Sequence, residues 1–240
     1  MARRGASISH KKGRPIVTRT IEPALVGSYP AANGREFLPV SGPELGRTQF
    51  AIERVLGSFP LAYGRFVLLI SLLENGAYAQ PFERAIMNMG LLCTNADDSR
   101  YEAVRIESIC RRFDVAAVVG VSAEVLTGLD EAGFALDAVF RDRIVWARAD
   151  AFDRLSQVPG IRSLRLMAEV GPAFALQCSA GEGVHVDSIE WYCTASDGAI
   201  VLSSRLLRAT PFEAHRSEVP GALIAEPCPC GNADLRLALG

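Results

Sequence analysis

Four potential metal ligands in two turn-forming segments constrain this 240-residue chain more than any other feature. Cys178 and His185 flank the loop Cys-Ser-Ala-Gly-Glu-Gly-Val-His, and Cys228 and Cys230 belong to the segment Cys-Pro-Cys-Gly. Three thiolates and one imidazole form a complete tetrahedral set for zinc, and glycine and proline favour the tight turns that can aim such side chains inward. A closed set of four ligands leaves no position open for a substrate, so we predict a structural zinc site.

The alternative is that Cys-Pro-Cys holds two ordinary thiols near the end of the chain and that the histidine lies on the surface. The two halves of the set are far apart in the sequence. Cys-x-Cys is also a less specific zinc signature than paired Cys-x-x-Cys motifs. Spacing alone therefore leaves both interpretations open.

The composition is that of a globular protein with room for one large core or two smaller ones. Hydrophobic residues make up 49% of the chain and charged residues 22%. A net charge of −2 provides no electrostatic basis for nucleic acid or an anionic membrane as the main partner. The six cysteines follow no apolar leader segment, so we expect reduced thiols in the cytoplasm. The longest apolar run, residues 66–73, is too short to span a membrane.

Residues 1–20 form a basic segment. They contain the only two lysines of the chain, Lys11 and Lys12, and no acidic residue occurs before Glu22. We expect a solvated, flexible tail; contact with nucleic acid or with an acidic surface of a partner is the alternative.

Between residues 21 and 160, unbroken apolar segments alternate with helical patterns. Residues 115–121 are apolar at every position, which is typical of a strand buried on both faces. The helical pattern before it opens with Ser99 and Glu102 at capping-box spacing. We predict an α/β region with a largely parallel sheet flanked by helices. The expected apolar strands are residues 66–73, 90–93, 115–121 and 144–146, and the expected helices are residues 81–89, 100–113, 123–133 and 152–157.

After Gly160 the helical periodicity fades. Short apolar segments at residues 163–167, 174–178, 189–194 and 199–206 alternate with turns such as Asp197-Gly198. The pattern predicts a smaller, mostly antiparallel β region over residues 161–240, which carries the zinc ligands.

Residues 41–47, Ser-Gly-Pro-Glu-Leu-Gly-Arg, have the form of a phosphate-binding loop. Such a loop presents consecutive backbone N–H groups to the anion, helped by hydroxyls and a lysine. Here Glu44 adds negative charge, Pro43 removes one donor, and no lysine follows. We therefore expect a plain turn.

Three other features are interpreted as structural. Cys93 and Cys110 lie in apolar segments without a nearby histidine, so we expect small core residues. The Asp97-Asp98 pair is expected to end a loop and cap the following helix, not to bind a metal ion.

A series of short motifs then occurs in a characteristic order. The motifs are Ala168-Glu169-Val-Gly-Pro, Cys178 to His185-Val, Asp197-Gly198-Ala-Ile-Val-Leu-Ser-Ser, Ala209-Thr-Pro211-Phe and Cys228-Pro-Cys230-Gly. Together with the helix and strand pattern of residues 106–122, they resemble the adenylate-forming acyl-CoA and aryl-CoA ligases, specifically the phenylacetate-CoA ligase-like branch. The resemblance implies a truncated ligase core with a structural zinc ion on Cys178, His185, Cys228 and Cys230.

Ligases of this kind activate a carboxylate with ATP, release pyrophosphate and pass the acyl group to coenzyme A. The resemblance leaves Ser41, Gly42 and Gly46 of their phosphate loop, Glu169 as the magnesium-linked acid, and Arg216 of the ribose-binding motif. Their mobile C-terminal domain with its catalytic lysine has no counterpart in the sequence. Sites for ATP, AMP and magnesium are thus expected to be eroded. Each lost contact to a phosphate or oxyanion removes roughly 10²–10³ in rate, so no useful adenylation is expected.

Three hypotheses for function follow. The preferred one is a non-catalytic binding or regulatory protein whose cleft holds an acyl or aryl ligand or a partner protein. The second is one part of a split ligase that another chain completes. The third is a structural subunit of a homo-oligomer.

Overall fold

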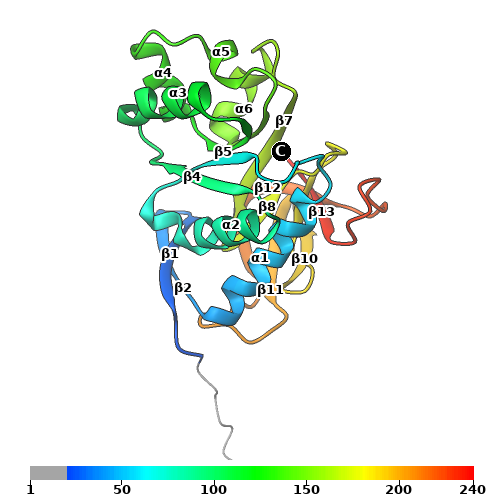
Figure 1. Ribbon diagram of the computed structural model, residues 1–240. Coiled ribbons are helices and arrows are strands. Elements are labelled where there is room, and N and C mark those ends of the chain that lie inside the picture. The colour runs from blue at the N-terminus through cyan, green and yellow to red at the C-terminus, as the bar shows by residue number, and fades with distance from the viewer. Residues whose placement is uncertain (1–20) are drawn as a thin grey trace, which may run out of the picture.

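The computed structural model describes residues 21–240, so the expected tail of residues 1–20 lies outside the described residues. The described chain forms one eleven-stranded sheet, a separate two-stranded hairpin and helices that pack on the sheet (Figure 1). The strands are β1 Leu25–Ala31, β2 Gly34–Val40, β3 Phe66–Ile70, β4 Leu92–Ala96, β5 Val115–Val121, β6 Ile144–Ala147, β7 Ser163–Val170, β8 Ala173–Leu176, β9 Val184–Val186, β10 Trp191–Ser196, β11 Ala199–Ser204, β12 His215–Ile224 and β13 Leu235–Leu239.

The helices are α1 Gly42–Leu56, α2 Gly76–Asn88, α3 Ala103–Arg112, α4 Ala123–Glu131, α5 Leu136–Phe140 and α6 Ala149–Ser156, with 3₁₀ turns η1 Leu73–Asn75 and η2 Arg100–Glu102. Within residues 21–240, no helix is long and apolar enough to cross a membrane.

The predicted α/β half is confirmed. Strands β4, β3, β5, β6 and β7 lie side by side in parallel. Every residue of β5 is buried, because α1 and α2 cover one face of this half and α3 to α6 cover the other. Along β3, Val67 and Leu69 point into the first core, and Leu68 and Ile70 point into the second. This alternation between two covered faces explains why the strands read as unbroken apolar runs.

The sheet changes direction at β7, which pairs in parallel with β6 and antiparallel with β8. Beyond β8, every strand pair is antiparallel and a third apolar core forms around Ile200 and Leu237. The predicted antiparallel region is therefore present. Because the sheet is continuous through β7, the division into subdomains at residue 160 stays a prediction.

Several predicted boundaries are wrong for local reasons. The strand expected to reach residue 73 ends at Ile70, and α2 begins at Gly76 and continues through Pro81, which the prediction placed at a helix start. Ser99 caps η2 by accepting a hydrogen bond from the Tyr101 N–H instead of forming a capping box. Asp98 does not cap a helix, because its carboxylate pairs with Arg148 at 3.0 Å.

Within the described chain, residues 21–60 differ most from the prediction. The expected plain turn at residues 41–47 is the first turn and a half of α1, with Ser41 as its N-cap. Just before it, β1 and β2 form an antiparallel hairpin that the sequence reading missed. Pro30 and Pro39 interrupt the alternation of apolar and polar residues in these strands, so the sequence pattern did not indicate them.

Candidate metal centre and ligand cavity

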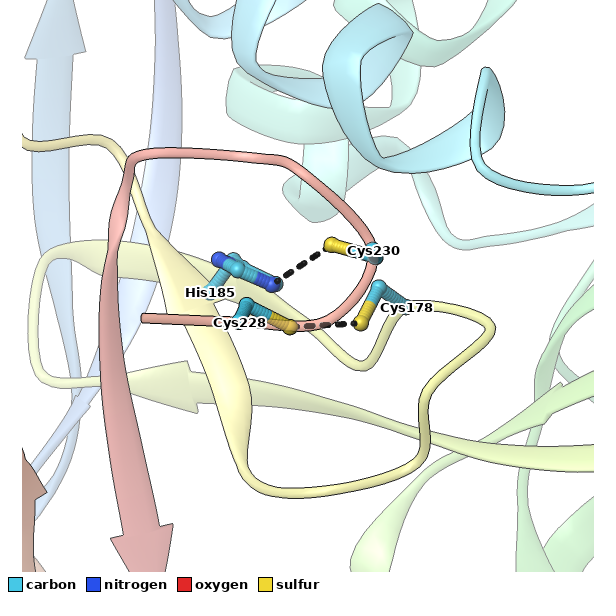
Figure 2. Close-up of side chains that lie close together, drawn as sticks. All are labelled: Cys178, His185, Cys228 and Cys230. Carbon is cyan, nitrogen blue, oxygen red and sulfur yellow. Dashed lines mark hydrogen bonds between the residues drawn. The ribbon is translucent and has the colours of Figure 1, made fainter. Parts of the chain in front are cut away.

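The four predicted metal ligands come together in the folded chain. The ligand atoms of Cys178, His185, Cys228 and Cys230 all lie within 4.8 Å of one another. Figure 2 shows the four side chains pointing toward a common centre, with the Sγ atoms of Cys178 and Cys228 3.5 Å apart. The Sγ atom of Cys230 lies 3.5 Å from Nε2 of His185. The cluster can bind a metal ion.

The fold of the antiparallel region explains this convergence. Cys178 follows β8, His185 lies on β9, and the Cys-Pro-Cys segment lies between β12 and β13. Since β13 pairs directly with β9, the two halves of the set become neighbours despite their separation in the sequence. Gly183 has a φ of 69°, and a Cβ atom there would approach the carbonyl oxygen of Leu237 to 2.7 Å. Only glycine fits at this close approach.

The surrounding groups suit a metal-thiolate centre. Nδ1 of His185 lies 3.1 Å from the main-chain oxygen of Asp234, so a proton there is donated to that carbonyl and Nε2 is left for the metal. Burial is the main cause that lowers the pKa of His185, which favours the neutral imidazole that a metal ligand requires. The backbone N–H of Asn232 donates to the sulfur of Cys230 at 3.4 Å. Three thiols and one imidazole with these neighbours are therefore chemically suited to bind zinc.

A cavity that opens to solvent lies beside this centre, lined by the hairpin, α1, α2 and the β8–β9 part of the sheet. It has a free volume of about 50 Å³, a few times the roughly 10–15 Å³ that one water needs. Its wall is largely aromatic and aliphatic, and Tyr78 stacks on Phe174 with 4.6 Å between ring centroids. The main apolar lining residues are Tyr29, Leu38, Ile52, Val55, Tyr78, Phe174 and Trp191, and the charged or titratable ones are Glu169, His185, Asp187, Glu190, Arg208 and Asp234.

No family model and no curated protein matches this sequence. Solved structures do match the fold. The open conformation of 2-hydroxyisobutyryl-CoA ligase, solved in complex with 2-HIB-AMP and CoA, is 12% identical and has a TM-score of 0.65 over 90% of this chain and 52% of that one. The apo structure of Mycobacterium smegmatis MbtA is also 12% identical, with a TM-score of 0.57 over 90% of this chain and 46% of that one.

The chain has the fold of adenylate-forming CoA ligases. It spans about half the length of the ligases it matches. At these identities the likeness is one of fold, and the phenylacetate-CoA ligase-like branch stays a prediction.

Within this ligase fold, the residues expected from the phosphate loop belong to the start of α1. Ser41 is the N-cap, and Gly42 and Gly46 are helical. The carboxylate of Glu44 accepts hydrogen bonds from the Ser41 N–H at 2.9 Å, the Ser41 hydroxyl at 2.6 Å and the Ala209 N–H at 2.8 Å. A helix N-terminus with free N–H groups is where an anion binds. Here the carboxylate of Glu44 closes a capping box with Ser41 and places a negative charge at that helix end.

Arg208 completes this arrangement, and the sequence reading missed it. Its buried guanidinium pairs with Glu44 at 2.8 Å and with Glu190 at 2.5 Å. It also lies 4.3 Å from the centroid of the Trp191 ring. Arg47 pairs with Glu190 from the other side. The sequence contains one signal for this ion-pair site, the acidic residue Glu44 in the first turn of α1. An acidic residue at a helix start is common for other reasons, so it does not point to Arg208.

The carboxylate of Glu169 also forms an ion pair, with Arg35 of the same chain. Arg35 on β2 donates two hydrogen bonds to its carboxylate, at 2.8 and 3.0 Å. This bond is the largest cause that raises the pKa of Arg35. Arg216, the other residue expected from the ligase motifs, is exposed on β12 and donates to the main-chain oxygen of Ser196 at 3.4 Å. It is not among the residues that line the cavity with Glu169.

Proposed function

We propose that this protein binds a small acyl or aryl compound in the cavity between α1, α2 and the sheet, and that it does not adenylate on its own. The observation that carries the proposal is the Glu44 carboxylate, which is buried beside the N-cap of α1 and already bonded to Ser41, Ala209 and Arg208. A phosphate placed there would meet a buried carboxylate already paired with Arg208. Catalysis by adenylate formation depends on stabilising phosphate charge, so this arrangement disfavours it.

The contact between Arg35 and Glu169 supports the same proposal. A magnesium ion at Glu169 would have to displace a guanidinium bonded to both carboxylate oxygens. Bidentate pairs of this kind are among the stronger hydrogen-bonded contacts in proteins. The lining of the cavity, with Tyr29, Tyr78 and Phe174 beside six charged or titratable groups, offers an apolar surface for a small ligand.

Calorimetric titration of the metal-loaded protein with ATP and AMP in the presence of magnesium tests the first part. We expect no heat up to millimolar nucleotide and no pyrophosphate release with butyrate, benzoate or phenylacetate. Micromolar nucleotide binding would overturn the proposal and favour a split ligase completed by another chain.

Thermal-shift titration with the same three acids tests the second part. At least one is expected to raise the melting temperature of the wild type but not of Ala51→Phe, which fills the cavity from α1. Ala195→Phe, at an exposed position on β10, is the matched control and should respond like the wild type. A response that survives Ala51→Phe would place the ligand elsewhere.

We further propose that the metal is zinc and that its role is structural, because three cysteines and one histidine close a tetrahedral site. Metal analysis should find about one zinc per chain. Cys228→Ser is expected to lose the metal and melt at a lower temperature. Cys193→Ser, which changes a buried cysteine outside the cluster, should keep its zinc. Unchanged metal content and melting temperature in Cys228→Ser would refute the assignment.

A further inference from the structure

The metal cluster and the ligand cavity share a wall. His185 belongs to both, since its Nε2 faces the cysteines and the residue also lines the cavity. Asp234 lines the cavity as well, and its main-chain oxygen holds the other nitrogen of the His185 ring. A change in the metal centre therefore reaches the cavity through residues in direct contact.

Arg54, in the last turn of α1, ties the helix to this wall. Its guanidinium donates to Asp234 at 2.7 Å and to Asp187 at 3.0 Å. Asp187 follows the ligand His185 on one loop, and Asp234 follows the ligand Cys230 on the other. One side chain of α1 thus holds both metal-binding loops.

Because these carboxylates are buried, losing their contact with Arg54 would be costly. The side chains of Asp187 and Asp234 are only 8% and 7% exposed, whereas that of Arg54 is 32% exposed. A buried carboxylate without its cationic partner is costly, so the two loops and α1 are most stable together. If the loops separate when the metal is removed, the guanidinium loses at least one of its partners.

The same helix shapes the cavity. Thr48, Ala51, Ile52 and Val55 of α1 line it, opposite Phe174 and Leu176 on β8. The position of α1 on the sheet therefore determines how wide the cavity is.

We propose that metal occupancy is coupled to the ligand cavity through Arg54, so that metal binding holds α1 in place and the cavity forms only in the metal-loaded protein. The ligand end of this coupling rests on the function proposed above. The metal end does not, and zinc alone tests it. Coupling between two sites is reciprocal, so a cavity ligand would in turn slow the loss of metal.

Hydrogen exchange followed by mass spectrometry measures the metal end. The full chain is compared with zinc bound and after removal of zinc by a chelator. Exchange in residues 48–55 of α1 is expected to become about tenfold faster without metal, in the range of ordinary coupling energies. Exchange in α4, which contacts neither the cavity nor the metal loops, reports the global loss of stability and should increase less than exchange in α1. A uniform increase in all elements, or no change in α1, would each overturn the proposal.

Arg54→Met keeps most of the apolar stem of the side chain and removes its charge. This variant should still bind one zinc, yet α1 should exchange at the same rate with and without it. Arg111→Met, which breaks only an exposed pair with Glu107 on α3, is the matched control and should behave as the wild type. If Arg54→Met does not fold, the comparison of zinc-loaded and zinc-free wild type still decides the matter, with Cys228→Ser as a chelator-free check.

A final titration separates this proposal from the proposed function. Phenylacetate, benzoate and butyrate are added to the wild type with and without zinc. If α1 responds to zinc but none of the acids binds, the coupling stands and the proposed ligand class fails. If an acid binds equally well with and without zinc, the ligand class stands and the coupling fails.

Discussion

The side chain of Glu44 determines whether residues 41–47 can bind a phosphate. Its carboxylate accepts hydrogen bonds from Ser41 and Ala209 and pairs with the buried Arg208. In a phosphate-binding loop, the corresponding N–H groups and cation would face a phosphate oxygen. The residue that weakens the phosphate-loop pattern in the sequence therefore places a paired carboxylate beside the helix start in the structure.

Glu44→Ala should destabilise the protein by about 3–5 kcal/mol, because it leaves the Arg208 guanidinium buried with one partner fewer. It should also open an anion site, so inorganic phosphate is expected to restore about 1–3 kcal/mol of the loss. Urea denaturation with phosphate, and with sodium chloride at equal ionic strength, measures both effects. Glu53→Ala, a change in the same helix, is the control. An equal response of wild type and Glu44→Ala to phosphate would contradict this account of Glu44.

Four of the six cysteines should separate into two classes under iodoacetamide at pH 7.5. Burial raises the pKa of Cys193 to about 12 and that of Cys110 to about 11, so both remain protonated thiols that react slowly. Cys228 and Cys230 are only partly buried, and we expect metal to protect them. A chelator should therefore make Cys228 react while Cys193, Cys110 and Cys230 stay unlabelled, since burial raises the pKa of Cys230 to about 12 as well. Peptide mapping reads out the result, and labelling that is indifferent to the chelator would exclude a role in metal binding.

At the scale of elements, residues 21–60 show how proline and glycine can conceal regular structure. The hairpin of β1 and β2 contains Pro30 and Pro39, and α1 opens with a glycine and a proline. Proline is well suited to the first turn of a helix, where its missing N–H is not needed. The Gly-Pro pair that suggests a turn in the sequence therefore begins a fifteen-residue helix.

Two glycines in helix interiors provide a matched test of this assignment. A Cβ atom at Gly46 of α1 would meet open space, whereas one at Gly128 of α4 would collide with the backbone of Arg100. Gly46→Ala should stabilise the protein by about 0.5–1 kcal/mol, because alanine is the better helix former. Gly128→Ala should destabilise it by about 1–3 kcal/mol through overpacking. Urea denaturation of both variants checks the signs, and a destabilising Gly46→Ala would argue against the helix at this position.

At the scale of the whole molecule, the sheet joins two kinds of strand pairing, and the metal cluster belongs to the second kind. The parallel half is held by two cores, one on each face. The antiparallel half has one core, with the cluster at the loops that link β8 to β9 and β12 to β13. A bound metal would join these loops at a place where no strand pairing holds them.

Removal of metal should therefore lower the free energy of unfolding. With free zinc at a thousand times its dissociation constant, the expected contribution is about 4 kcal/mol. Urea denaturation of the wild type with zinc and with a chelator measures it. Cys228→Ser should show the lower stability in both conditions. A wild type equally stable in both would mean that the cluster does not contribute through metal.

Much of the fold could be predicted because its signals are local. Residues 115–121 form β5 as expected, since a run that is apolar at every position is stable only between two covered faces. The clustering of Cys178, His185, Cys228 and Cys230 was also predictable, because cysteine and histidine carry their chemistry in the residue type and glycine and proline mark the turns that gather them. The helix at residues 42–56 was not, because a single turn-like motif outweighed the pattern that follows it.

The sequence by itself determined the alternation of strands and helices, the change to antiparallel strands and the identity of the possible metal ligands. Only the tertiary structure decided what the charged residues do. Arg35 meets Glu169 across 134 positions of the chain, and Arg54 meets Asp234 across 180. Periodicity arises between near neighbours, whereas these ion pairs depend on which strands and helices pack together, and that packing follows from the burial of the apolar cores together.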